Sequence, residues 1–192
     1  IAGIGETTYQ RGYAPGEEHT TRSLATWAVG NAMADAGLNA ADVDGMLSYS
    51  GNDSTFSPFV AGDLGIRLNF YMDCFGGGSS TEALIGIAMG VIEAGMCDTV
   101  AVFRSMNGFS QVRIGGTGAR AAAPVSGDAL HGRAYGWGSA GQMFAPTFMR
   151  HMCDYGTRPE PVAAVKAIHS EYASNNPRAF NKERVAVEEV LE

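Results

Sequence analysis

The sequence is poor in several features that would narrow its class. It has 3 cysteines and 7 prolines among 192 residues, and the cysteines show neither C-x-x-C nor His-rich spacing. A disulfide framework and a zinc site are therefore not expected. No apolar run reaches the roughly 18 residues that a membrane span needs, and the opening IAGIGETTYQ has no basic stretch followed by a cleavage site. We expect a cytoplasmic protein without a membrane span.

Basic residues are also scarce, with 13 Lys and Arg against 20 Asp and Glu and a formal net charge of −7. Such a chain is a poor nucleic-acid binder. Between residues 105 and 140, however, Arg113, Arg120 and Arg133 are opposed only by Asp128. These arginines could hold one small anionic ligand, or they could be ordinary surface, and the sequence leaves both interpretations open.

Apolar residues and glycine are plentiful: 45% of the chain is hydrophobic, and 26 residues are glycine. Residues 1–104 alternate between strand-like and helix-like patterns, which predicts an α/β domain with a largely parallel sheet. The predicted strands are 1–4, 45–50, 70–73 and 99–103, and the predicted helices are 20–36 and 81–94. The first helix would begin at an N-cap of Thr20 or Thr21 and end before Gly37.

Two of these segments carry further expectations. The helix over 81–94 is apolar on most sides, which predicts a buried helix. The strand over 99–103 is continuously apolar, which predicts a central position in a sheet covered on both faces.

The pattern disappears between residues 105 and 138 and returns as helical spacing at 144–152 and 162–172. We therefore divide the chain into a core over 1–104, an insertion with loops and helices over 105–180, and the start of a continuation over 181–192. The last residues look like an unfinished helix, so we expect another ~200 residues, on the usual size of domains.

The most informative local feature is the Gly/Ser turn over 74–80 that leads into the helix over 81–94. Such a turn aims several backbone N–H groups at one point, where a thioester oxygen or a nucleophile can use them. The donors would come from Gly76, Gly77 and Gly78, with Ser79 and Ser80 as candidate catalytic residues. Cys74 is the nearby thiol, and it is a nucleophile in one interpretation and a small buried residue in the other.

A second candidate is the segment His131-Gly-Arg-Ala-Tyr-Gly-Trp-Gly138. Aromatic and Gly-rich loops of this kind line ligand pockets, but a subunit contact would need the same composition. In the first interpretation the substrate-binding residues are Arg113, Arg120, His131, Arg133, Tyr135 and Trp137.

The order of these parts resembles the thiolase superfamily, and within it the thiolase-like lipid-transfer proteins related to the thiolase domain of sterol carrier protein X. Each matching motif is short, and together they cover essentially the whole chain. The matching segments are Ile1–Thr7, Asp35–Asn39, Asp42–Gly45, Gly76–Gly95, Cys97–Asp98, Val100–Phe103, His151–Gly156 and Asn176–Ala179.

The resemblance implies a layered fold of two β-α-β-α-β halves, of which this chain is the first, with a large insertion. It also implies a homodimer that acts on acyl-CoA thioesters, with coenzyme A as part of the substrate and no bound cofactor. A branch of the family cleaves steroid side chains as β-hydroxyacyl-CoA thioesters by a retro-aldol reaction, together with an OB-fold partner protein. In that branch the tyrosine bases would lie in the second half.

The sequence departs from the thiolase pattern at the nucleophile. Thiolases begin the buried helix with a cysteine in a pattern like C-x-S-G, whereas counting back from Gly95 places this position at Gly78, with Ser79 and Ser80 following. Retro-aldol cleavage needs a base and enolate-stabilising donors but no covalent nucleophile. We therefore expect an aldolase. The alternatives are a thiolase that uses Cys74 and a non-catalytic carrier or scaffold of lipid-CoA esters.

Overall fold

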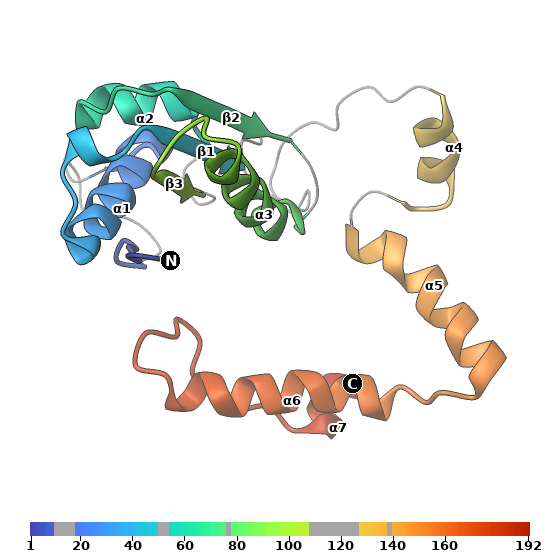
Figure 1. Cartoon of the computed structure of the whole chain (residues 1–192). Helices are drawn as coiled ribbons and strands as arrows, with labels where there is room; N and C mark the ends of the chain where they lie inside the picture. Colours follow the sequence, from blue (N-terminus) through green and yellow to red (C-terminus); the bar gives the residue numbers. More distant parts are fainter. Residues whose placement is uncertain (10–17, 50–53, 76–77, 108–126, 138–139) are drawn as a thin grey trace. The chain divides into compact units, whose positions relative to one another are not determined.

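The computed structural model describes residues 1–9, 18–49, 54–75, 78–107, 127–137 and 140–192 (Figure 1). The chain divides into two compact units, Ile1–Ile114 and Gly115–Glu192. The elements of the first unit are α1 (Thr21–Ala36), η1 (Ala40–Asp42), β1 (Gly45–Tyr49), α2 (Ser57–Leu64), β2 (Phe70–Cys74), α3 (Ser80–Glu93) and β3 (Val100–Phe103). Those of the second unit are α4 (Asp128–Ala134), α5 (Ala140–Tyr155), α6 (Glu160–Asn175) and α7 (Val187–Leu191).

The sheet of the first unit has three parallel strands in the order β2-β1-β3. Gly45 lies opposite both Phe70 and Val100, so the strands start in register. The predicted parallel sheet is thus confirmed. The central position predicted for 99–103 is wrong among the described residues, because β1 is the middle strand and β3 an edge. A continuous apolar run reports that both faces of a strand are covered, and it carries no information on strand order.

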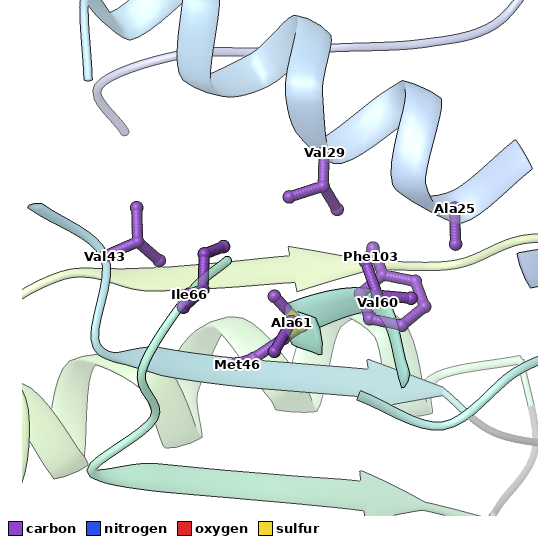
Figure 2. Close-up of a cluster of buried hydrophobic side chains, with 8 residues drawn as sticks. All are labelled: Ala25, Val29, Val43, Met46, Val60, Ala61, Ile66 and Phe103. Atoms are coloured by element: carbon purple, nitrogen blue, oxygen red, sulfur yellow. The ribbon is translucent and has the colours of Figure 1, made fainter. Parts of the chain in front are cut away.

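Helices cover the sheet on both faces. α1 and α2 pack on one face around a cluster that also contains Met46 and Phe103 (Figure 2). α3 packs on the other face, where Leu84 and Ala88 contact Leu47 of β1. Met46 and Leu47 point to opposite faces, as expected for neighbours in a strand.

The predicted ends of α1 agree with the structure. The Thr20 hydroxyl accepts a hydrogen bond from the Ser23 backbone N–H at 3.1 Å, and Ser23 Oγ accepts one from the Thr20 N–H at 3.0 Å. Gly37 ends the helix with φ of +69°, a conformation that glycine adopts without strain.

The strand predicted over 1–4 is not formed among the described residues. This segment lies instead against α1, where the Ile4 N–H donates to Asp35 at 2.9 Å and Asn31 donates to the Glu6 carbonyl at 3.0 Å. The contact is so close that a Cβ on Gly5 would lie 2.2 Å from the Ala28 carbonyl oxygen. An open groove of about 580 Å³ lies between residues 1–5 and β3, which explains why the segment lacks a ladder partner.

The helix predicted to be buried on most sides is buried on one. Leu84, Ala88 and Val91 of α3 are buried against the sheet. Exposed apolar side chains line the opposite side, with 42% of Ile85, 67% of Met89 and 42% of Ile92 accessible. The prediction is therefore wrong for the described residues, because the sheet covers only one side of α3.

In the second unit, α5 and α6 contain the predicted helical segments 144–152 and 162–172. The final helix α7 packs on α6. Between them, the Ser170 hydroxyl of α6 accepts a hydrogen bond from the Val185 N–H at 3.0 Å.

Candidate functional site

The carboxyl ends of β1, β2 and β3 meet at one edge of the sheet, which is where open parallel sheets place their ligands. The side chains at this edge point to two faces. Ser48 and Asp73 point toward α2: the Ser48 hydroxyl donates to Asp73, and Asp73 accepts hydrogen bonds from Ser57 of α2. Tyr49 and Cys74 point toward α3 and contact the cluster of Leu47, Leu84 and Ala88. The Gly/Ser turn and the start of α3 follow Cys74 directly.

On the α3 face of this edge lies a positively charged side chain, Arg104. Arg104 directly follows β3, and its guanidinium carbon lies 4.0 Å from the centroid of the Tyr49 ring. Its Nη1 donates to the Tyr49 carbonyl at 2.8 Å. Because Tyr49 is the register partner of Cys74, these three residues form a row across the three strands. The row combines a thiol, an aromatic ring and a guanidinium.

The first turn of α3 lacks a side-chain cap. Ser79 occupies the N-cap position with φ of −70° and ψ of −6°, and its hydroxyl accepts no hydrogen bond from the helix. The N–H groups at the start of a helix have no partner within the helix. Those of Ser80, Thr81 and Glu82 can therefore donate to an acceptor on a ligand, and the helix dipole favours negative charge there.

The start of α2, at the same edge of the sheet, is capped from outside the helix. Its N-cap residue, Phe56, has no hydrogen-bonding side chain, and Pro58 in the first turn has no N–H. The Phe59 N–H donates to the Phe56 carbonyl at 3.1 Å, and the Ser57 N–H donates to the Asp73 carboxylate of β2 at 2.9 Å. The same oxygen accepts hydrogen bonds from the Ser57 hydroxyl at 2.7 Å and from the Ser48 hydroxyl.

The opposite edge of the sheet contains a second well-bonded carboxylate. Burial alone would raise the pKa of Asp44, but hydrogen bonds from the Thr99 and Asp98 N–H groups and from Asn69 outweigh it and lower the pKa below 3.8. Nearby, burial raises the pKa of the Cys97 thiol, and the carboxylates of Asp44 and Asp98 raise it further. Cys97 is therefore a poor nucleophile.

The structure brings part of the predicted site together. Cys74 ends β2, Gly78 and Ser79 lie in the turn, and Ser80 opens α3. Cys74 lies at the strand end and is separated from the start of the helix by residues 75–79. Gly76, Gly77, Arg113 and Arg120 lie outside the described residues.

The predicted aromatic segment lies in the second unit. The rings of His131 and Tyr135 are 5.4 Å apart, and Trp137 packs on Gly132, whose Cβ position would be 3.2 Å from the indole. His131, Tyr135 and Trp137 are exposed. Arg133 belongs to α4, but its side chain lies outside the described part of the structure.

Sequence reasoning missed Tyr49, Asp73 and Arg104. Each lies at or directly after the carboxyl end of a strand that the sequence did predict. The rule that ligands bind beyond these ends would have selected them from the strand boundaries alone.

Among the described residues, no group of three or more His, Cys, Asp or Glu side chains could hold a metal ion. No helix in the same part of the chain is long and apolar enough to span a membrane. The groove along β3 is mainly apolar, and its lining includes Arg104 but not Cys74 or Ser79.

Comparison with known proteins gives relatives along nearly the whole chain, although no family profile matches it. A steroid side-chain-cleaving aldolase from Thermomonospora curvata is 31% identical over 192 residues, which cover 96% of this chain and 47% of the relative. A 17-hydroxy-3-oxo-4-pregnene-20-carboxyl-CoA lyase from Mycobacterium tuberculosis is 29% identical over 184 residues, which cover 94% of this chain and 46% of the relative. The chain thus spans about half the length of the curated relatives it matches.

Solved structures with a similar fold agree with these sequence relatives. The Ltp2-ChsH2(DUF35) aldolase superposes with a TM-score of 0.81 at 27% identity and covers 98% of this chain and 47% of its own. The SCP2-thiolase like protein type 1 from Mycobacterium smegmatis superposes with a TM-score of 0.74 at 22% identity, over 100% of this chain and 38% of its own, and supports the fold alone.

The fold and these relatives define the chain as a thiolase-like α/β protein, which confirms the predicted fold class. Within that class its sequence is similar to proteins named as a steroid side-chain-cleaving aldolase and an acyl-CoA lyase. The resemblance inferred from the sequence is therefore confirmed.

Proposed function

We propose that the protein carrying this chain cleaves a carbon–carbon bond of a bulky β-hydroxyacyl-CoA, such as a steroid or lipid side-chain thioester, by a retro-aldol reaction. The observation that carries the proposal is the first turn of α3, which presents uncapped N–H donors without a cysteine at the helix start. The names of the aldolase and lyase relatives support the same chemistry.

In this reaction a base removes the proton of the β-hydroxyl group, and the Cα–Cβ bond breaks as the carbonyl forms. The electron pair passes to the thioester, which becomes an enolate, and a proton returned to Cα completes the shortened acyl-CoA. Donors placed at the developing oxyanion are the main catalytic requirement. The N–H groups of Ser80, Thr81 and Glu82 supply them, and Ser79 and Ser80 add hydroxyl donors. We assign the base to the part of the protein beyond these 192 residues.

We assign binding of the anionic CoA portion to the arginines of the 105–140 segment, Arg113, Arg120 and Arg133, together with His131, Tyr135 and Trp137. A guanidinium binds phosphate through paired hydrogen bonds, and aromatic rings can stack on a nucleobase. We also propose a homodimer and an OB-fold partner that holds the CoA ester. The two components in the name of the Ltp2-ChsH2(DUF35) aldolase support a partner protein.

The test is to incubate the protein with a β-hydroxyacyl-CoA and to follow free thiol with a thiol reagent and all products by mass spectrometry. A retro-aldol reaction yields one shortened acyl-CoA and one carbonyl compound, with no change in free thiol. In a parallel incubation with a β-ketoacyl-CoA and added free CoA, a thiolase consumes free thiol and yields two thioesters. A carrier leaves the substrate unchanged, and either of these two results would contradict the proposal.

The thiolase alternative rests on Cys74 and is tested separately by a Cys74→Ala variant, with Cys153→Ala as the matched control. Cys74 is half-buried and Cys153 exposed, and both are free thiols. An aldolase keeps its activity in both variants, because its chemistry needs no thiolate. Loss of activity in the Cys74 variant alone, together with an acyl adduct on Cys74, would establish the thiolase.

A further inference from the structure

We propose that Asp73 is a positioning residue for the candidate site. Its carboxylate fixes the carboxyl end of β2 to β1 and α2, at the edge of the sheet where α3 also begins. The catalytic consequence of this role rests on the proposed function. The structural consequence does not.

The first argument is the hydrogen bonding of a single oxygen. Asp73 Oδ1 accepts hydrogen bonds from the Ser57 N–H, the Ser57 hydroxyl and the Ser48 hydroxyl. Both serines are fully buried, at 0% accessibility. Hydrogen bonds to a carboxylate are about twice as strong as neutral ones. Asp73, itself half-buried, therefore joins three elements, β1, β2 and α2, through hydrogen bonds whose donors lie on fully buried residues.

The second argument concerns the Ser57 N–H, since the Ser48 hydroxyl also lies 3.5 Å from the Thr55 carbonyl oxygen. The α2 N-terminus lacks a side-chain cap of its own, and Phe59 already donates to the Phe56 carbonyl at 3.1 Å. If the end of β2 moved away, the Ser57 N–H would be left in a buried place without its acceptor. Buried donors without acceptors are strongly disfavoured, so the end of β2 is held in one position.

The third argument is that Asp73 is the direct neighbour of Cys74, so fixing the Asp73 side chain also fixes the orientation of Cys74. Asp73 faces α2, and its neighbour Cys74 faces α3, where it contacts the Leu47 cluster. Fixing one side chain of a strand fixes the orientation of the next. The turn that begins after Cys74 consequently starts from a defined point and direction, which its donors need in order to meet a substrate oxygen.

The structural test is the rate of Cys74 alkylation by iodoacetamide in the folded protein, followed by peptide mass spectrometry. In Asp73→Ala the end of β2 loses its anchor, and Cys74 should react about tenfold faster than in the parent protein. Asp73→Asn keeps an oxygen but loses the charge, so its increase should be about threefold. The matched control is Asp44→Asn, which weakens a similar carboxylate at the other edge of the sheet and should change the Cys74 rate less than about twofold.

Two results would overturn the structural role. One is an unchanged Cys74 rate in both Asp73 variants. The other is an increase that Asp44→Asn reproduces, because the rate would then follow global stability. Asp73→Asn preserves the volume of the side chain, so it decides the question if Asp73→Ala fails to fold.

The catalytic test uses the same Asp73→Asn change in the protein that turns over a β-hydroxyacyl-CoA. Because the N–H donors at the start of α3 act mainly on the enolate, kcat should fall about tenfold while KM changes less than about threefold. Equal changes in kcat and KM, or none, would reject the positioning role in catalysis. If the parent protein shows no aldolase activity while Cys74 alkylation responds as expected, the proposed function fails and the structural role of Asp73 stands.

Discussion

The helices α2 and α3 both begin at the carboxyl edge of the sheet, one after β1 and the other after β2. Neither helix has a side-chain cap of its own, since the side chains of Phe56 and Ser79 accept no hydrogen bond from their first turns. The α2 N-terminus nevertheless has a carboxylate, Asp73, bound to it from the neighbouring strand. The α3 N-terminus has no such group among the described residues.

The difference separates a structural helix start from one that is available to a ligand. A carboxylate that accepts hydrogen bonds from the first N–H groups of a helix is stabilising. α3 has an acidic residue in its first turn, Glu82, but its N-cap residue Ser79 makes no side-chain hydrogen bond to the helix. At α3 the same donors can bind an oxygen that gains charge during a reaction. Mutations can add a carboxylate to the α3 N-terminus or remove a hydrogen bond from the α2 N-terminus, which makes the comparison testable.

The largest effect is expected when the α3 N-terminus is given a carboxylate, as the α2 N-terminus has in Asp73. Ser79→Asp places a carboxylate beside the N–H groups of Ser80, Thr81 and Glu82, where it competes with the substrate oxyanion and repels it. Removing the use of such donors costs about 10²–10³ in rate, so kcat/KM for β-hydroxyacyl-CoA cleavage should fall at least about 100-fold. Stability should rise by about 0.3–1 kcal/mol, as measured by urea unfolding.

The matched control is Ser79→Asn, which is similar in size and uncharged. It should reduce kcat/KM much less than Ser79→Asp does. Equal losses in the two variants would show that bulk and not charge is responsible, and retained activity in both would remove the α3 N-terminus from the mechanism.

A second prediction weakens the capping of the α2 N-terminus by Asp73. Ser57→Ala deletes a fully buried hydroxyl that donates to Asp73 at 2.7 Å but leaves the Ser57 N–H bond in place. The free energy of unfolding should fall by about 1–2 kcal/mol, since one charge-assisted hydrogen bond is lost. Denaturant unfolding at pH 7 measures it, and an unchanged midpoint would mean that Asp73 holds α2 through the backbone alone.

Local sequence signals predicted most of the elements that carry this comparison. The ends of α1 followed from Thr20 and Gly37, whose capping roles depend only on neighbouring residues. The strands at 45–50, 70–73 and 99–103 followed from short apolar runs between turns. In each case the interactions that decide the structure lie within a few residues of the pattern.

The incorrect predictions concern interactions between segments that are distant in sequence. Residues 1–4 have a strand-like composition, but Gly3 and Gly5 let them lie directly on α1, and no pattern within the segment reports this contact. The apolar surface of α3 could not show that only one side is covered. The role of Asp73 likewise depends on Ser48 and Ser57, which lie 25 and 16 residues away.

A third prediction compares Asp73 with Asp44, the carboxylate at the opposite edge of the sheet. The pKa of Asp44 is lowered in the folded protein, so its ionised form stabilises the fold at pH values above the ordinary carboxyl pKa of 3.8. This contribution should decline as the pH falls below that value and disappear at the lower pKa of the folded state. Asp44→Asn should cost about 1 kcal/mol at pH 7, and less as the pH falls toward 3.

Urea unfolding of both proteins between pH 7 and pH 3 provides the measurement. The two stability curves should converge at the acid end. Parallel curves would show that the hydrogen bonds from Asp98, Thr99 and Asn69 do not depend on the charge of Asp44.

The smallest effect concerns the reactivity of the two thiols at opposite edges of the sheet. Cys97 is buried, with a pKa raised by burial and by the carboxylates of Asp44 and Asp98, whereas Cys74 is half-buried at the edge where the site lies. Because the thiolate is the reactive form, iodoacetamide at pH 7 should modify Cys74 faster than Cys97. Asp44→Asn removes one of the charges that raise the Cys97 pKa, so the Cys97 rate should increase modestly while the Cys74 rate stays the same. A faster reaction at Cys97 than at Cys74 in the parent protein would contradict this prediction. It would show that the thiol near Asp44 is more reactive than the thiol at the carboxyl ends of the strands.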